Sequence, residues 1–170
     1  YVGAGFNAYG IAAGGGAGMA LAEWVAHGQP PYDLWPVDIR RFGKPHQDLE
    51  WVRKRTYEAY AKHYTMAWPF EEHSSGRNYQ SSPIYESLSS VNACFGEKMG
   101  WERPNWFAPK GMEPKDIYSY DRQNWFEIVG EEVKAVREKA VLIDQTSFAK
   151  FIMSGEDATK ALDYICSNRI

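Results

Sequence analysis

The sequence has little cysteine, no long apolar run and no excess of basic residues, and each of these absences excludes a class of protein. The two cysteines, Cys94 and Cys166, are far apart and form neither a Cys-x-x-Cys pair nor a zinc-binding set, which excludes a disulfide framework. Because no stretch of about 18 apolar residues occurs, we expect no membrane span. With 19 basic against 22 acidic residues and a formal net charge of -3, the chain lacks the charge typical of nucleic-acid-binding domains.

Apolar and aromatic residues, by contrast, are plentiful. They make up 44% and 15% of the 170 residues, which is enough to bury a core. The chain begins at Tyr1 rather than Met and opens directly into an apolar run without a leader sequence. Its last residues have the pattern of a helix end followed by something further. We therefore expect an internal piece of a longer protein.

Glycine is concentrated at the start of the chain, where seven of the 15 glycines lie within the first 18 residues. Small and bulky residues alternate over residues 1–6 and predict a short buried strand. A turn at residues 7–10 and a glycine-rich turn at residues 14–18 follow, and then a helix that Gly28 ends. The opening is therefore predicted to be a strand, a glycine-rich turn and a helix.

The rest of the chain predicts mainly helices and loops. Helical spacing and capping residues predict helices over residues 48–64, from Ser82-Pro83 onward, over 124–139, and after a Ser-x-x-Asp capping box at 154–157. The inner stripe of the helix over residues 48–64 is predicted to be Leu49, Val52, Thr56, Ala59, Tyr60 and His63. That of the helix over residues 124–139 is predicted to be Trp125, Ile128, Val129, Val133 and Val136. Runs at 140–143 and 150–153 predict two strands, and the aromatic segment 97–109 is predicted to be irregular.

The glycine-rich turn is the first candidate for a binding site. Residues 3–8 match a G-x-G-x-x-[GA] dinucleotide fingerprint, but that motif needs a helix that starts inside it. Because Gly10 and the triple glycine should break such a helix, we reject this interpretation. A helix that begins in glycine exposes backbone N–H groups and its positive dipole end, which allows a flat or anionic ligand to lie against the backbone. Tight packing of the helix on a strand explains the glycines equally well.

Other residue types give weaker signals. No metal-ligand spacing and no catalytic role is indicated for the four histidines, His27, His46, His63 and His73. No serine lies in a G-x-S-x-G elbow. The segment 100–107 places Arg103 beside tryptophans, an arrangement that stacks on bases or clamps carboxylates. Given the net charge, we favour a structural junction filled by the tryptophans, with Arg103 paired to an acid.

Taken in order, the segments resemble a known family. Residues 1–10 (YVGAGFNAYG), 14–24 (GGGAGMALAEW) and 38–42 (DIRRF) resemble the end of the flavin domain of sarcosine and dimethylglycine dehydrogenases. Residues 76–78 (GRN), 82–85 (SPIY) and 100–107 (GWERPNWF) resemble their central domain. Residues 141–151 (VLIDQTSFAKF) and 155–158 (GEDA) resemble the start of their folate-binding domain, which is shared with glycine-cleavage aminomethyltransferases.

The resemblance implies a mixed α+β fold in three parts. Residues 1–43 would be the C-terminal edge of an α/β FAD-binding domain, 44–115 a small central domain, and 116–170 the start of an aminomethyltransferase-like α+β domain. The implied activity is that of an FAD-dependent oxidoreductase acting on CH–NH groups, which demethylates sarcosine or dimethylglycine and passes the one-carbon unit to tetrahydrofolate. The implied electron acceptor is an electron-transfer flavoprotein. The implied location is the mitochondrial matrix, or the cytoplasm in a bacterium.

The resemblance also implies roles for single residues. We expect the contacts to the pyrimidine end of the flavin to be Asn7, Gly10, Ile11, Ala12, Ala13, Gly14, Gly15 and Gly16. Phe148 stands where aminomethyltransferases often have Met and is expected to line the folate pocket, whereas Asp144 is interpreted as a structural acid rather than a catalyst. No catalytic residue of the family falls in this chain, so we expect it alone to be inactive. We also expect it to fold poorly alone, because its first strand and helix lack their sheet and its last helix lacks its domain. The competing hypothesis is a non-catalytic regulatory paralogue that resembles the pyruvate dehydrogenase phosphatase regulatory subunit.

Overall fold

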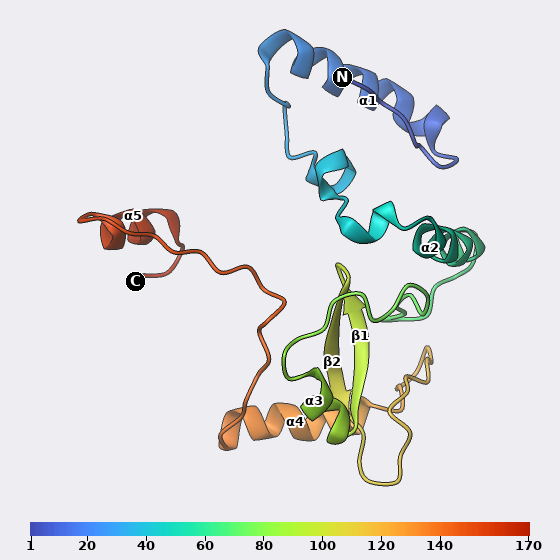
Figure 1. Cartoon of the computed structure of the whole chain (residues 1–170), viewed down its shortest axis with the longest axis vertical. Helices are drawn as coiled ribbons and strands as arrows, with labels where there is room; N and C mark the ends of the chain where they lie inside the picture. Colours follow the sequence, from blue (N-terminus) through green and yellow to red (C-terminus); the bar gives the residue numbers. More distant parts are fainter. The chain divides into compact units, whose positions relative to one another are not determined.

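The structure, a computed structural model, describes all 170 residues and divides them into two compact units, Tyr1–Leu49 and Glu50–Ile170 (Figure 1). The first unit contains one long helix, α1 (Gly10–His27). Three short 3-10 helices follow it, at Trp35–Val37, Ile39–Arg41 and Lys44–Gln47. The remaining α-helices and strands are α2 (Leu49–Lys62), α3 (Tyr85–Ser90), β1 (Ala93–Lys98), β2 (Trp101–Phe107), α4 (Phe126–Glu138) and α5 (Ala158–Ile165). The mixed α+β class is thereby confirmed. None of the helices is both long enough and apolar enough to cross a bilayer.

The start of the chain lies along α1 in an extended conformation. The ring of Tyr1 packs edge-on against that of Trp24, with centroids 5.5 Å apart. Residues 1–6 form no strand, however, and of these only Phe6 is even partly buried. The predicted buried strand is therefore wrong, because the segment packs on a helix and has no neighbouring strand to complete a ladder.

The glycine run belongs to the body of α1 and forms no turn. The helix begins at Gly10 and includes Gly14, Gly15 and Gly16, so the predicted turn at residues 14–18 is wrong. A glycine inside a helix destabilises it by only about 1 kcal/mol relative to alanine, which the alanines and the packed tryptophan of α1 can offset. The end of the helix is as predicted: Gly28 has a φ of 75°, and its N–H donates to the carbonyl of Trp24 at 2.8 Å.

The centre of the second unit is an antiparallel hairpin of β1 and β2 (Figure 1). Met99 and Gly100 form its two-residue turn, with φ angles of 52° and 84°, as the tight turns of hairpins require. The register shifts between Cys94 and Phe95, and Phe95 then pairs with Pro104. The prediction that residues 97–109 are irregular is therefore wrong, because the turn lacks the usual Asn-Gly signal and Pro104 interrupts the strand pattern.

The core of the second unit lies where α4 packs on the hairpin. Trp106 is only 1% exposed and clusters with the buried side chains of Cys94 and Ala108. Met112, Trp125, Ile128 and Val129 pack against this cluster. The inward stripe predicted for the helix over residues 124–139 is thus confirmed for its first turns. It is wrong for Val133 and Val136, which are about half exposed.

Helix α2 turns a different face to its neighbours than its apolar pattern predicts. Leu49 and Tyr60 from the predicted inner stripe are 76% and 71% exposed. The contacts are made instead by Trp51, Arg55, Glu58 and Lys62, which recur at helical spacing along one face. Hydrogen bonding to a loop, rather than apolar burial, orients this helix.

The C-terminal third contains helix α5 but no strand. Residues 140–143 and 150–153 form no β-ladder with any other segment, so both predicted strands are wrong. Helix α5 is confirmed, although its N-cap is Asp157, which makes no side-chain capping bond, so the predicted capping box does not form. The helix predicted from Ser82-Pro83 is also confirmed as α3, which begins at Tyr85.

Candidate functional site

The predicted flavin contacts lie at the N-terminus of α1. A tight turn precedes the helix, in which the N–H of Tyr9 donates to the carbonyl of Phe6 at 2.9 Å. Asn7 and Ala8 adopt positive φ angles of 46° and 74° within that turn. The first bond of the helical ladder runs from the Ala13 N–H to the Tyr9 carbonyl at 2.8 Å. The backbone N–H groups of residues 10–12 are therefore the donors that a helix leaves to caps, water or ligands.

The structure brings the eight predicted flavin residues together on one helical segment and its preceding turn. All of them except Ala13 are exposed, and Ile11 is fully so. No heavy atom lies within 4 Å of a Cβ built on Gly14, Gly15 or Gly16. The segment is therefore an open, uncharged surface at a helix N-terminus, which suits close approach of a flat group. The structure also rejects the dinucleotide fingerprint, but not because the glycines break a helix. The strand that must precede the motif is absent.

The predicted folate residue Phe148 lies in a loop that contacts the hairpin. Its ring is about half exposed, and the guanidinium carbon of Arg103 lies 4.9 Å from its centroid. Arg103 thus pairs with an aromatic ring instead of the predicted acid. In the same loop, Asp144 accepts bonds from the N–H and hydroxyl of Thr146 at 2.9 and 2.6 Å. Hydrogen bonds from Ser82 and Thr146 lower the pKa of Asp144, as expected for a structural acid.

A buried ion pair ties the hairpin to the loop before α3. Glu102 of β2 is almost fully buried, and its carboxylate accepts from Arg77 Nε at 2.9 Å, from Arg77 Nη2 and from the backbone N–H of Asn78 at 2.7 Å. Arg77 Nη2 also donates to the carbonyl of Phe95 in β1 at 2.9 Å. The hydrogen bonds to Glu102 raise the pKa of Arg77. The guanidinium therefore joins both strands.

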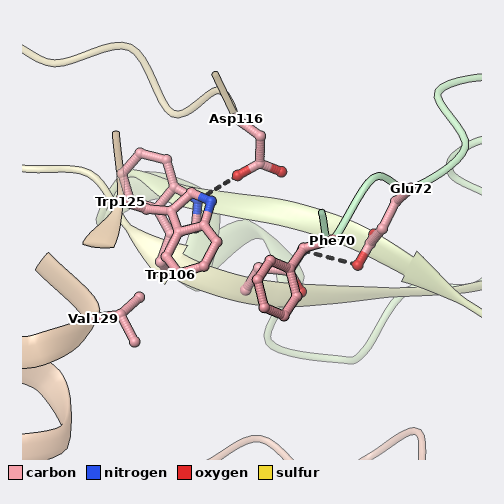
Figure 2. A pocket seen from close by; sticks show the side chains of 7 residues that line it. Phe70, Glu72, Trp106, Asp116, Trp125 and Val129 are labelled. Carbon is pink, nitrogen blue, oxygen red and sulfur yellow. Dashed lines mark hydrogen bonds between the residues drawn. The ribbon is translucent and has the colours of Figure 1, made fainter. Parts of the chain in front are cut away.

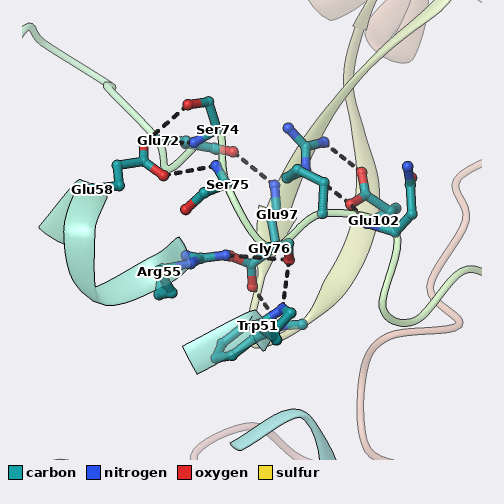
Figure 3. Close-up of polar contacts among 12 residues, drawn as sticks. Trp51, Arg55, Glu58, Glu72, Ser74, Ser75, Gly76, Glu97 and Glu102 are labelled. Carbon is teal, nitrogen blue, oxygen red and sulfur yellow. Dashed lines mark hydrogen bonds and ion pairs between the residues drawn. The ribbon is translucent and has the colours of Figure 1, made fainter. Parts of the chain in front are cut away.

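The polar face of α2 holds the same loop from its other side (Figure 3). Trp51 Nε1 donates to the carbonyl of Gly76 at 3.0 Å, and Arg55 forms an ion pair with Glu97 at 2.8 Å. Glu58 accepts the backbone N–H groups of residues 74 and 75, each at 2.7 Å. Burial raises the pKa of Glu58, but hydrogen bonds from Lys62 and from these N–H groups outweigh burial and hold it well below its usual range.

A hollow of the second unit lies beside the core and has a volume of about 240 Å³ (Figure 2). Three aromatic side chains line it: Phe70, Trp106 and Trp125. Its other lining residues are Glu72, Asn105, Asp116 and Val129. These residues come from separate loops, from β2 and from α4, so no local spacing in the sequence indicates the pocket. Sequence reasoning missed it for that reason.

Both carboxylates of the pocket are held by neutral donors. Asp116 Oδ1 accepts from Trp106 Nε1 at 2.7 Å and from the thiol of Cys94 at 3.7 Å. The carboxylate of Glu72 accepts from Asn105 Nδ2 at 3.2 Å and from the Glu97 N–H at 2.8 Å. Neither carboxylate forms an ion pair, whereas Glu97 and Glu102 do.

Metal and thiol chemistry find little support in the structure. No three His, Cys, Asp or Glu side chains are grouped so that they could hold a metal ion. Cys94 is buried and Cys166 is exposed, both as free thiols. Burial, together with the nearby charge of Asp116, raises the pKa of Cys94 to about 12, which makes this thiol a poor nucleophile.

Two family models match adjoining parts of the chain. The FAD dependent oxidoreductase central domain matches residues 27–82, and the GCVT N-terminal domain matches residues 84–170. The order of these matches is the order that the sequence predicts. The domain boundaries at residues 43/44 and 115/116 stay a prediction.

Several curated proteins are similar over nearly the whole chain. The 4-methylaminobutanoate oxidase (formaldehyde-forming) of Paenarthrobacter nicotinovorans is 44% identical over 93% of this chain and 19% of its own length. Human mitochondrial sarcosine dehydrogenase is 35% identical over 98% of this chain and 21% of its own length. Rat mitochondrial dimethylglycine dehydrogenase is 37% identical over 100% of this chain and 20% of its own length. The chain thus spans about a fifth of the length of these relatives.

Proposed function

The chain belongs to the sarcosine and dimethylglycine dehydrogenase family, and from that membership we propose that it contributes to an FAD-dependent oxidation of an N-methyl amine. The observation that carries this proposal is the succession, in one chain, of an FAD dependent oxidoreductase central domain and a GCVT N-terminal domain. The substrate class is an N-methylated amino acid. Sarcosine, dimethylglycine and 4-methylaminobutanoate are the candidates, because each gives its name to a similar protein.

The N-terminus of α1 fits a flavin by its shape and by its donors. Glycines at positions 14–16 leave space that a Cβ would take, and no charged side chain lies between Gly10 and Ala22. Bound FAD would supply the hydride acceptor. The backbone N–H groups at the start of α1 would hold the negative charge that arises beside them on reduction, which the helix dipole stabilises by roughly 0.3–2 kcal/mol. Asn7, Gly10 and the residues up to Gly16 are the proposed contacts.

The second part of the proposed function is transfer of the one-carbon unit to tetrahydrofolate. The match to a GCVT N-terminal domain supports a folate-binding region, and Phe148 is its proposed contact. The ring of Phe148 is held on one side by Arg103 and is otherwise about half exposed, so it can stack on a flat ring. We further propose an electron-transfer flavoprotein as acceptor. The mitochondrial matrix is the proposed location in a eukaryote and the cytoplasm in a bacterium, because the mammalian relatives carry mitochondrial names and another relative is bacterial.

A regulatory role is the second candidate. A mouse pyruvate dehydrogenase phosphatase regulatory subunit is also among the similar proteins, so the fold of this chain does not require an oxidase. Such a paralogue would keep the core of the second unit and lose the need for an open glycine surface on α1. The open glycine surface on α1 therefore favours the oxidoreductase.

The visible flavin spectrum of the intact parent protein that contains this chain tests the proposal. We expect a bound flavin that is bleached, under anaerobic conditions, by one of the three N-methyl amines. A chain without flavin, or a flavin that none of the amines reduces, would favour the regulatory candidate. Gly15→Ala should lower the flavin content, because a Cβ would enter the proposed contact surface. Gly18→Ala is its control, since it makes the same change on the same helix outside the proposed contacts.

A further inference from the structure

The pocket of about 240 Å³ beside the core has a lining that the proposed function does not explain. It combines aromatic rings from three parts of the chain with carboxylates. Phe70 and Trp125 meet edge-to-face, with ring centroids 5.6 Å apart, and Trp106 closes the floor (Figure 2). A pocket of this size holds a small molecule or a single functional group rather than a whole cofactor.

The position of Phe70 is unusual for an apolar side chain. Its ring is 74% exposed, although it lies next to a pocket with apolar walls. Its backbone has a φ of 63°, a conformation that a bulky residue rarely adopts. Neither burial nor backbone preference therefore explains an aromatic residue at this position. A ligand that uses the face of the ring would explain it.

The charges at the pocket point to a cation. Several part-buried carboxylates of this unit form ion pairs, as in Arg55–Glu97, Lys62–Glu58 and Arg77–Glu102, whereas others, such as Asp144, are held by hydrogen bonds. Asp116 has no such partner: both of its hydrogen bonds come from neutral donors and fall on Oδ1, which leaves Oδ2 as an acceptor. A carboxylate beside three aromatic rings attracts a cation both by its charge and through the rings.

Glu72 adds a second carboxylate, and its position depends on a glycine. A Cβ built on Gly96 would lie 2.1 Å from Glu72 Oε2 and 2.2 Å from Asn105 Nδ2. Glu72 can therefore accept the Glu97 N–H only because residue 96 has no side chain. The side chains of Lys98 and Arg103 border the adjoining hollow on the far side of Glu72, so Asp116 is the stronger determinant of the two.

We infer that this pocket binds a small methylated ammonium ion, with its methyl groups against Phe70 and Trp125 and its charge beside Asp116. Aromatic cages recognise such cations because the charge is spread over methyl groups that can contact the ring faces. The inference rests on the pocket alone and not on the proposed oxidation. The N-methyl amines of that proposal nevertheless belong to the same chemical class.

The test uses tetramethylammonium chloride as the probe and the intact parent protein that contains this chain. Binding is followed by saturation-transfer NMR on the probe methyl protons, at constant ionic strength set with sodium chloride. We expect Asp116→Asn to weaken binding about fivefold to tenfold, because it removes the charge and keeps an oxygen that can accept from Trp106 Nε1. Asp121→Asn makes the same change in the same loop but outside the pocket, and should leave binding unchanged.

A variant of Phe70 and a neutral analogue of the probe test the inference further. Phe70→Leu retains an apolar side chain at an exposed position, so it should fold, and it should weaken binding because it removes a ring. tert-Butanol, a neutral molecule of similar shape, should bind less well than the probe. The inference is overturned if the probe does not bind, if Asp116→Asn and Asp121→Asn bind it alike, or if tert-butanol binds equally well. None of these outcomes depends on flavin reduction, which separately tests the proposed function.

Discussion

Replacing Glu102 by glutamine should destabilise the β1–β2 hairpin. The Glu102 carboxylate and its partner Arg77 together connect β2, β1 and the loop before α3. The substitution keeps the shape of the side chain and one oxygen for the Asn78 N–H. It removes the charge and turns an NH₂ group toward one of the two nitrogens that Arg77 presents. The side chain of Glu102 is 1% exposed and that of Arg77 is 27% exposed, so water can replace only part of what is lost.

The expected loss follows from these contacts. Removing one partner of a fully buried ion pair costs about 3–5 kcal/mol, and partial access of water to Arg77 lowers this to about 2–4 kcal/mol. The opening equilibrium of β1 and β2 should then rise by about 30-fold to about 900-fold. Hydrogen–deuterium exchange of the amides in residues 93–107 measures this opening directly in the full chain.

A surface pair provides the matched control. Glu127 bonds to Arg122 at 2.8 Å, but their side chains are 81% and 72% exposed. Glu127→Gln should therefore change the free energy of hairpin opening, measured by exchange, by less than about 1 kcal/mol. If Glu102→Gln affects the hairpin amides no more than Glu127→Gln does, the ion pair does not hold the strands and the reasoning is wrong. A double change of Arg77 and Glu102 to methionine should recover much of the loss, because it leaves no buried charge without a partner.

Two further predictions concern acid stability and thiol reactivity. The pKa of Glu58 is lowered in the folded state from its ordinary value of 4.5, so its stabilising effect is present above that pH and is lost as the pH falls below it. The fall in stability with pH below pH 4.5, followed by circular dichroism, should therefore be shallower for Glu58→Gln than for the unchanged protein. Glu50→Gln, an exposed change on the same helix, should leave that slope unchanged. Equal slopes in the two variants would contradict this role of Glu58. Cys94, with a pKa of about 12, has a thiolate fraction of about 10⁻⁴ at pH 8. Iodoacetamide at pH 8 should therefore label the exposed Cys166 much faster than Cys94, which peptide mass spectrometry can measure. Labelling of both thiols at the same rate would refute the burial of Cys94.

The sequence predicts most helices of this chain because their signals are local. Apolar spacing in α4 and the stop at Gly28 act within a few residues, and both are found in the structure. The face that α2 presents could not be predicted in the same way. Trp51 and Arg55 donate to a carbonyl of a loop about 20 residues further along the chain, and Glu58 accepts a backbone N–H of the same loop. Apolar periodicity carries no information about such partners.

The hairpin and the pocket were missed for two different physical reasons. The turn at Met99 and Gly100 places a methionine at a positive φ, where the usual signal is asparagine or aspartate, so its sequence does not resemble a hairpin turn. The pocket joins residues from Phe70 to Val129 that share no spacing. Only the register of β1 and β2, together with the packing of α4, brings them together.

The glycines of α1 give the strongest argument that its surface contacts something. Three consecutive glycines inside the helix, at positions 14, 15 and 16, destabilise it by about 3 kcal/mol relative to alanine. An added Cβ would meet nothing at any of them, so nothing within the first unit requires their absence of side chains. We propose that the requirement comes from a group that approaches the helix backbone, as the flavin of the proposed function would. Because the neighbouring Ile11 is fully exposed and no charged side chain lies nearby, that group is better matched by a flat, mainly uncharged ring than by a phosphate.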